Sequence, residues 1–178
     1  TGKGRTTCAA FLPGDSLILY ASTHEFADTC PPVPDKKKIG KYVWPVYNSY
    51  EIYIADLNGH IKKRLTNNHS YDAEATVSPK GDKIIFTSDR DGDLDLYEMN
   101  LDGSNVKRIT SKMGYDGGAW FSPDGSKIVW RCSRPVNRRR RNWRGANLGP
   151  EPGHGRSQFD RLRGAALDRA AATDSVGP

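Results

Sequence analysis

YDAEATVSPKGDKIIF at residues 71–86 is repeated 44 residues later as YDGGAWFSPDGSKIVW at residues 115–130. The same step of 44 residues relates KRLT at 63–66 to KRIT at 107–110. Self-similarity at one fixed period is the signature of a repeat architecture, in which each unit packs against the next. The sequence therefore predicts a tandem array of small structural units.

Turn residues divide one repeat into four short segments. KGD at 80–82 ends the first segment, DG at 91–92 ends the second, and DG at 102–103 ends the third. Asp-Gly pairs favour tight hairpins between antiparallel strands. Four short strands within 44 residues match a β-propeller blade, whose repeat is about 40–45 residues, and match no helical repeat.

An earlier copy of the pattern precedes these two. FLPGDSLILY at 11–20 has the same proline turn and strand, but Pro13 precedes Pro79 by 66 residues. The difference from 44 is an insertion of 22 residues, which falls within 24–49. We therefore expect an all-β, partial β-propeller of about 2.5 four-stranded antiparallel blades within residues 1–134, with the blades at about 5–66, 70–110 and 115–133.

Three runs of residues carry a resemblance to a known family. SPDGSKIVW at 122–130, SDRDG at 88–92 and LDGSN at 101–105 are similar to the repeat of the TolB-like β-propeller family, a WD-like β-propeller repeat. The resemblance covers residues 8 to about 134. It implies a parent ring of about six blades and an exported protein, located in the periplasm or outside the cell.

An incomplete ring has consequences for the rest of the molecule. A blade buries both faces of its sheet against its neighbours, so an unclosed stack leaves an apolar face and an open strand edge. We therefore expect the chain to be a piece of a larger protein, whose missing blades are among its partners. No apolar run approaches the about 18 residues that span a membrane, so we expect no membrane span.

The positive charge of the chain is concentrated after the repeats. Residues 1–130 carry 16 Lys and Arg against 17 Asp and Glu, whereas residues 131–178 carry 11 Arg, no Lys and 4 acidic residues. The net charge of +6 therefore describes the tail and not a basic surface of the folded part. Binding of nucleic acid would depend on the arginine run at 138–141 alone, and we do not expect it to be the main function.

The tail at 135–178 has no strand pattern and is rich in Arg, Gly and Ala. Three interpretations stay open: a disordered basic arm, a divergent extension, or translation of GC-rich DNA in the wrong frame. We favour the third, because GC-rich codons give Arg, Gly, Ala and Pro in any frame and the change falls in mid-blade. A weak helix over 157–172 is a further prediction, although Gly164 interrupts it.

Motifs for catalysis and cofactor binding are missing from the sequence. We find no GxSxG elbow, no HExxH motif, no phosphate-binding GxxxxGK[ST] loop and no dinucleotide fingerprint, so we expect neither an enzyme nor a cofactor. The four His are scattered and the three Cys form no CxxC pair, which argues against a zinc site. Cys8 and Cys30 are a possible disulfide if the protein is exported, and the sequence leaves this open.

Four aspartates at alternate positions invite a calcium site. Asp89, Asp91, Asp93 and Asp95 would supply the carboxylate oxygens that hard cations prefer. Gly92 stands at the fourth place of such a loop and not at the sixth, and no Glu closes the loop at the twelfth. We therefore interpret this stretch as a hairpin turn with polar faces and without a metal.

Candidate binding residues gather where the loops leave one face of the blades. In each blade the loop between the second and third strands and the connection to the next blade emerge together. This face combines the insertion with the connection at 67–70 and the turn at 89–91, and its candidate residues are Trp44, Tyr47, His69, Asp89, Arg90 and Asp91. Aromatic residues anchor interfaces, so Trp44 and Tyr47 predict a recognition surface. The alternative is that both side chains fold back onto their own blade.

The innermost strands supply three further candidates. Asp72, Glu74 and Asp116 would lie at the mouth or wall of the central channel, where carboxylates bind a cation or a basic peptide, or line a wet wall without a ligand. The sequence as a whole predicts a non-catalytic scaffold for protein or peptide binding. The alternative is the propeller part of a peptidase whose catalytic domain lies outside this chain, and the third class is a tail that binds nucleic acid.

Overall fold

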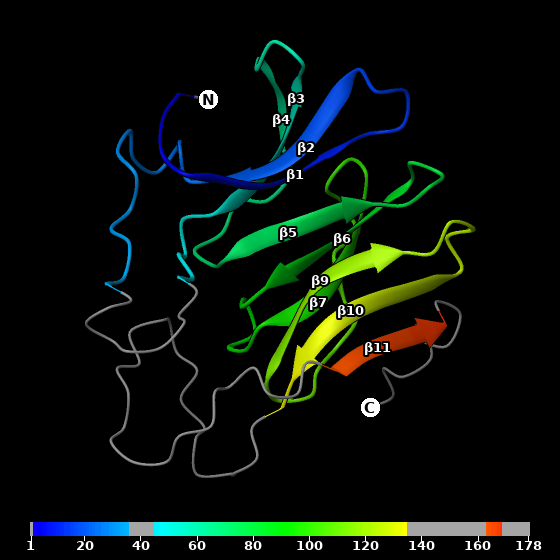
Figure 1. The fold of residues 1–178 in the computed structure, drawn as a ribbon. Helices are drawn as coiled ribbons and strands as arrows, with labels where there is room; N and C mark the ends of the chain where they lie inside the picture. Colours follow the sequence, from blue (N-terminus) through cyan, green and yellow to red (C-terminus); the bar gives the residue numbers. More distant parts are fainter. Residues whose placement is uncertain (1, 36–44, 135–162, 169–178) are drawn as a thin grey trace, which may run out of the picture.

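Three antiparallel sheets follow one another in the computed structural model, which describes residues 2–35, 45–134 and 163–168 (Figure 1). The first sheet has the order β1-β2-β3-β4, with the bounds Thr6–Phe11, Leu17–Ser22, Glu51–Asp56 and Ile61–Arg64. The second has the order β5-β6-β7-β8, with the bounds Asp72–Val77, Lys83–Ser88, Asp95–Asn100 and Lys107–Arg108. The third has the order β11-β10-β9, and its strands β9, β10 and β11 span Tyr115–Phe121, Lys127–Ser133 and Arg163–Asp168.

The all-β prediction is confirmed, since the described ranges contain strands and turns and no helix. Two of the sheets have the four antiparallel strands expected of a blade. The first strands of the three sheets, β1, β5 and β9, run side by side, as the inner strands of neighbouring blades do (Figure 1). The described part of the chain therefore has no helix that is long and apolar enough to cross a membrane.

The same turn closes the first hairpin of the second and third sheets. Gly81 N donates to Ser78 O at 2.9 Å, and Gly125 N donates to Ser122 O at 2.8 Å. Both glycines have a φ of +71°, which is strained for a residue with a Cβ. The SP(K/D)G pattern of the sequence therefore acts through backbone geometry, because glycine adopts this φ without a Cβ clash.

Each first strand contains a β-bulge at an equivalent position. The register shifts at this point where β1 pairs with β2, β5 with β6 and β9 with β10. Cys8, Glu74 and Gly118 have φ values of +53°, +55° and +59° there, in the left-handed region. A bulge removes a residue from the strand pairing and re-aims its side chain. In β5 the side chain that the bulge re-aims is that of Glu74.

The core lies between the sheets. The layer between the first and second sheets includes Leu19, Ile52, Ile84, Phe86 and Met99. The layer between the second and third sheets includes Ile85, Leu96, Ala119, Ile128 and Trp130. The consecutive residues Ile84 and Ile85 thus face opposite neighbours, because successive side chains of a strand point to opposite faces. The second sheet buries both faces, as a propeller blade does.

Strand β11 differs from the prediction for the tail. The sequence predicts a weak helix over 157–172, but Arg163–Asp168 pairs antiparallel with β10, from Lys127 opposite Asp168 to Cys132 opposite Arg163. The prediction is wrong for these six residues. Without them β10 would be the open edge of an unfinished sheet, and its backbone N–H and C=O groups favour a partner strand over a weak local helix. The predictions for 135–162 and 169–178, including the arginine run, lie outside the described residues.

Cys8 and Cys30 are not joined by a disulfide. Cys30 Sγ donates to Gly4 O at 2.9 Å, and Cys8 Sγ lies 3.2 Å from Thr7 Oγ1. Each thiol therefore has a local polar partner. The bridge that the sequence leaves open is not formed in this structure.

Candidate functional site at the loop edge

One edge of the sheets collects the long loops, because the first and third strands begin there and the second and fourth strands end there. We call it the loop edge; its described residues are 23–35, 45–50, 65–71, 89–94 and 109–114. The opposite edge, the turn edge, carries the short turns at 12–16, 57–60, 78–82, 101–106 and 122–126. The described parts of the insertion lie at the left of Figure 1, at the loop edge.

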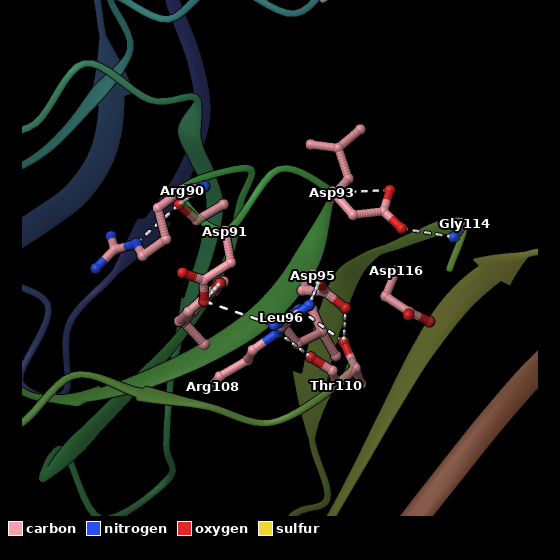
Figure 2. Close-up of polar contacts among 12 residues, drawn as sticks. Arg90, Asp91, Asp93, Asp95, Leu96, Arg108, Thr110, Gly114 and Asp116 are labelled. Atoms are coloured by element: carbon pink, nitrogen blue, oxygen red, sulfur yellow. Dashed lines mark hydrogen bonds and ion pairs between the residues drawn. The ribbon is translucent and has the colours of Figure 1, made fainter. Parts of the chain in front are cut away.

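The turn between β6 and β7 accepts hydrogen bonds from two connections, the one that leads into β5 and the one that leads into β9. Tyr71 N, just before β5, donates to Asp89 Oδ1 at 2.7 Å. Gly114 N, just before β9, donates to Asp93 Oδ2 at 2.7 Å (Figure 2). Burial raises the pKa of Asp89, although the Tyr71 amide opposes this shift. Segments that are far apart in the sequence therefore meet at the loop edge, as the strand pattern predicts.

Asp72 and Arg90, both predicted as binding residues, bind each other. The Arg90 guanidinium donates from Nη2 to both carboxylate oxygens of Asp72, at 3.0 and 3.1 Å. It also lies over two rings, 5.2 Å from the centroid of Phe86 and 4.8 Å from that of Tyr97. Asn68 Nδ2 completes the cluster with a hydrogen bond of 2.6 Å to Asp72 Oδ2. Asp72 is fully buried, so its charge is balanced inside the blade.

Asp116 holds the position of Asp72 in the third sheet, 44 residues later. Its Oδ1 accepts from Trp130 Nε1 at 2.8 Å and from Arg134 Nη2 at 2.7 Å. Arg134 stands 44 residues after Arg90. Oδ2 of Asp116 is buried and has no hydrogen-bond partner among the described residues. The third sheet therefore repeats the Asp–Arg pair but lacks the amide that Asn68 supplies in the second.

Glu74 joins the second sheet to the third. At the β5 bulge its Oε2 accepts from Thr87 Oγ1 of its own sheet at 2.9 Å, and from Tyr115 Oη and Gly118 N of the next sheet, each at 2.9 Å. Burial, together with this carboxylate, raises the pKa of Tyr115. The phenol therefore stays protonated and donates. Glu74 is buried and acts as a tie between blades.

The three inner-strand carboxylates are therefore not lined up on an open wall. Asp72, Glu74 and Asp116 are all buried, and each accepts hydrogen bonds from side chains of its own or the next sheet. A carboxylate buried in a low-dielectric interior needs such partners to stay charged. A cation or basic peptide would have to displace these partners to reach Asp72 or Glu74.

A second polar cluster recurs at the loop edge, and sequence reasoning missed it. Asp95 accepts from Arg108 Nη2 at 2.5 Å and from Thr110 Oγ1 at 3.0 Å (Figure 2). Thr110 Oγ1 in turn accepts from Leu96 N at 2.9 Å. In the first sheet the same positions hold Glu51, Arg64 and Thr66, and Arg64 Nη2 lies 3.1 Å from Glu51 Oε1. The sequence did contain a signal for this cluster. KRLT and KRIT repeat at a step of 44 residues, and the acidic residues Glu51 and Asp95 are separated by the same step.

The four alternating aspartates have separate partners. Asp91 Oδ2 accepts from Tyr97 Oη at 2.6 Å, whereas Asp89, Asp93 and Asp95 bind the groups already described. The hairpin interpretation of this stretch is confirmed, because β6 pairs with β7 from Ser88 opposite Asp95 onwards. Within the residues that the structure describes, no group of three or more His, Cys, Asp or Glu is arranged to hold a metal ion.

Other residues of the loop edge remain open to solvent. His69 and Asp91 are exposed, and so are three apolar side chains, Phe26 and Val33 of the insertion and Met113 of the connection to β9. Phe26 is 76% exposed, which is unusual for an aromatic side chain of this size. Sequence reasoning missed these three, because an isolated apolar residue in a loop carries no pattern.

Tyr47, a predicted recognition residue, ties the insertion together. Its Oη donates to Pro32 O at 2.6 Å, and its ring lies 6.0 Å from that of Tyr50, centroid to centroid. Tyr47 also packs against the cluster of Ala21, Tyr50, Tyr71 and Ala73. These contacts support the alternative that this side chain folds back onto its own blade. Trp44, its predicted companion, lies outside the described residues.

Comparisons with known proteins match this architecture. The family described as the TolB beta propeller domain matches residues 33–140. TolB from Acinetobacter baumannii is 28% identical, with a TM-score of 0.51, over 72% of this chain and 27% of that one. A putative TolB from Agrobacterium tumefaciens is 20% identical, with a TM-score of 0.51, over 90% of this chain and 60% of that one. A puromycin-hydrolyzing peptidase of Mycobacterium tuberculosis, 12% identical over 74% of this chain and 19% of that one, has a TM-score of 0.50 and is similar in fold alone.

Proposed function

Because the chain belongs to the TolB beta propeller domain family, we propose that it is a non-catalytic scaffold that binds a protein or peptide through its loop edge. One contrast carries this proposal. The buried carboxylates Asp72 and Asp95 are bound by arginine side chains of the blades, whereas Phe26, Val33 and Met113, in loops of the same edge, remain exposed. The polar groups maintain the scaffold, and the exposed apolar groups are available to a partner.

The chemistry of the exposed residues fits a polypeptide partner. A protein interface has an apolar centre and a polar rim, and the loop edge offers apolar side chains together with the exposed His69 and Asp91. Each exposed apolar side chain gains free energy when a partner removes it from water. We therefore expect the partner to supply apolar or aromatic side chains to this edge.

Family membership also supports a location and a set of missing partners. We propose an exported protein, in the periplasm or outside the cell, as the resemblance implies. The chain spans 27% of the length of the A. baumannii protein and 60% of that of the A. tumefaciens protein. We therefore propose that further blades complete the propeller in the parent protein.

A second candidate function is the propeller portion of a peptidase. The similar fold of the M. tuberculosis peptidase supports it, at the level of fold alone. The two candidates differ in what the parent gene encodes next to these blades. A hydrolase domain in the adjoining coding sequence favours the peptidase, and further blades without one favour the scaffold.

Selection of peptides from a random-sequence phage library on the folded chain tests the scaffold proposal. We expect Phe26→Ser and Met113→Ser to weaken binding of the selected peptides at least about tenfold each, which corresponds to about 1.4 kcal/mol. The matched control is Val106→Ser, because Val106 is an exposed apolar residue of the turn edge. Equal loss in the control, or unchanged binding in both loop-edge variants, contradicts the proposal.

A further inference from the structure

The segment that leads into β1 lies against the first part of the insertion. Gly4 N donates to Asp28 O at 2.8 Å, and Cys30 Sγ donates to Gly4 O at 2.9 Å. Lys3 Nζ lies 3.0 Å from Asp28 Oδ2. We call residues 3–5 the entry segment and residues 23–30 the first limb of the insertion. These contacts hold together two segments that β1 and β2 separate in the sequence.

Comparison of the repeats separates two kinds of contact in this region. Arg5 N donates to Thr23 Oγ1 at 2.9 Å, and 66 residues later Tyr71 N donates to Asp89 Oδ1 at 2.7 Å. This contact therefore belongs to the blade pattern. The remaining contacts of the entry segment are made to the insertion, where the chain has 22 residues more than the regular repeat. They are an addition to the blade pattern, and the blade itself does not require them.

Gly4 allows the backbones of the entry segment and the first limb to approach closely. A Cβ at this position would lie 2.7 Å from both Cα and N of His24. Both are backbone atoms, so the first limb itself would have to move to make room. Gly2, two residues earlier, has a similar left-handed φ of +69° against +60° for Gly4, but a Cβ there would meet nothing within 4 Å. The close approach, and not the φ, distinguishes Gly4.

The first limb presents Phe26 to solvent. Phe26 N and Ala27 N both donate to Thr23 O, at 3.0 and 3.2 Å, so residues 23–27 form a turn that leaves the Phe26 side chain exposed. Phe26 stands between Thr23 and Asp28, and both of these accept hydrogen bonds from backbone amides of the entry segment. The backbone is therefore held on each side of Phe26 before any partner binds.

We propose that Gly4 is a positioning residue of the loop-edge binding site, and that the entry segment fixes the first limb so that Phe26 meets the partner in one place. This role rests on the proposed scaffold function and names what prepares its site. Gly4 acts through Phe26 and not by touching the partner. A loop that is already ordered loses less conformational entropy when it binds, so its affinity is higher.

The affinity of the library peptides for the full chain tests this role, with peptides chosen because Phe26→Ser weakens their binding. Gly4→Ala should weaken the same peptides at least about threefold, because the first limb must move and its ordering then opposes binding. Gly2→Ala is the matched control. It places a Cβ at the same kind of φ without a close neighbour, so it should leave the affinity unchanged.

Double variants separate positioning from a general structural effect. Gly4→Ala combined with Phe26→Ser should bind no more weakly than Phe26→Ser alone, because Gly4 acts through that ring. Gly4→Ala combined with Met113→Ser should lose the product of the two single losses, because Met113 belongs to a different loop and independent sites contribute additive free energies.

Circular dichroism verifies that each variant keeps its strand content, and substitutions of Cys30 replace Gly4→Ala if that variant does not fold. Cys30→Ala removes the donor to Gly4 O and should weaken binding about twofold, because S–H···O hydrogen bonds are weak. Cys30→Ser keeps a donor and should bind like the unmodified chain.

Three results overturn the positioning role and leave the scaffold function intact: Gly4→Ala that binds Phe26-dependent peptides as tightly as the unmodified chain, an equal loss in Gly2→Ala, or a double variant with Phe26→Ser that loses the product of the single losses. A library that yields no peptide dependent on Phe26 overturns the positioning role as well. If its peptides depend on neither Phe26 nor Met113, the scaffold function is overturned with it.

Discussion

The residues at the inner strands show how the repeats keep buried charge balanced. Asp72 pairs with Arg90 in the second sheet, and Asp116 pairs with Arg134 in the third. In the first sheet the same two positions hold Thr6 and His24. The carboxylate and the guanidinium of the pair are thus replaced together in the first sheet. A single replacement would leave an unpaired buried charge, which costs about 3–5 kcal/mol.

Glu74 is the residue whose loss should weaken the blade contact most directly. Glu74→Ala leaves Thr87 Oγ1, Tyr115 Oη and Gly118 N without their acceptor. Buried donors without partners are costly, so we expect a loss of about 3 kcal/mol in the free energy of unfolding, measured by urea titration. Glu74→Gln keeps an acceptor oxygen and should lose less than half as much. If Glu74→Ala unfolded at the same urea concentration as the wild type, these hydrogen bonds would contribute little to the free energy of unfolding.

His24 should make the stability of the first sheet depend on pH. Its ring lies 4.5 Å from that of Tyr53, centroid to centroid, and neither ring nitrogen has a hydrogen-bond partner among the described residues. Burial lowers the pKa of His24, and the nearby Glu25 only partly opposes this. The folded state therefore binds this proton less readily than the unfolded state, whose His pKa is about 6.5. Stability is then fully present above that pH and is lost as the pH falls towards the folded-state pKa.

Urea midpoints at about pH 8 and about pH 5.5 measure this effect. His24→Phe keeps an aromatic ring on Tyr53 and removes the titrating group, so its midpoint should fall less between the two pH values. His69→Phe is the control, because His69 is exposed. A wild-type midpoint that rises on acidification would mean that the Glu25 carboxylate stabilises the protonated ring.

At the scale of the element, each blade boundary is a connection that ties the end of one sheet to the start of the next. Asn68 N donates to Glu51 Oε1 at 2.8 Å and Asn68 Nδ2 donates to Asp72 Oδ2 at 2.6 Å, so one residue binds both sheets. The next boundary has Lys112 at the equivalent position. There Asp116 Oδ2 is buried without a hydrogen bond from the described residues.

Lys112→Asn should therefore stabilise the second boundary. An amide at this position would donate to Asp116 Oδ2 as Asn68 does to Asp72, and a satisfied buried acceptor is worth about 1 kcal/mol. Differential scanning calorimetry should show a higher Tm. Ser111→Asn is the matched control, since it stands at the position of the exposed Asn67 and should change nothing. No rise for Lys112→Asn would mean that the two boundaries differ in backbone geometry.

At the scale of the whole molecule, stability comes from layers in series. Each layer joins only adjacent sheets, one through Leu19 and its neighbours and the other through Ile128 and its neighbours. In such stacks the free energy is approximately a sum of the units and of their nearest-neighbour interfaces. A substitution in one layer should therefore destabilise the two sheets that form this layer more than the remaining sheet.

Hydrogen exchange measured by mass spectrometry tests this expectation. Ile128→Ala and Leu19→Ala each remove a buried side chain and should cost about 2–5 kcal/mol. Ile128→Ala should speed exchange of β9 and β10 much more than that of β2 and β3, and Leu19→Ala should do the reverse. Equal acceleration of all strands by both variants would show that the sheets unfold as one cooperative unit.

Much of the architecture follows from sequence periodicity. The step of 44 residues, the SP(K/D)G turns and the Asp-Gly turns predict antiparallel four-stranded units, because turn geometry depends on the residues of the turn itself. The meeting of loops at one edge is a further consequence of strand order. The predicted binding role of Tyr47 and of the inner carboxylates had no such local basis, since it depends on which groups approach from other strands.

The repeat, the strands within it and the edge of each sheet at which the loops emerge follow from the sequence, because they depend on residues close together in the chain. The partners of the charged groups, by contrast, follow from how the sheets pack. Asp72 meets Arg90, Glu74 meets Tyr115 of the next sheet, and β10 meets β11. The physical reason is that a buried carboxylate or strand edge takes whichever donors packing brings within hydrogen-bond distance, and that packing is a property of stacked sheets.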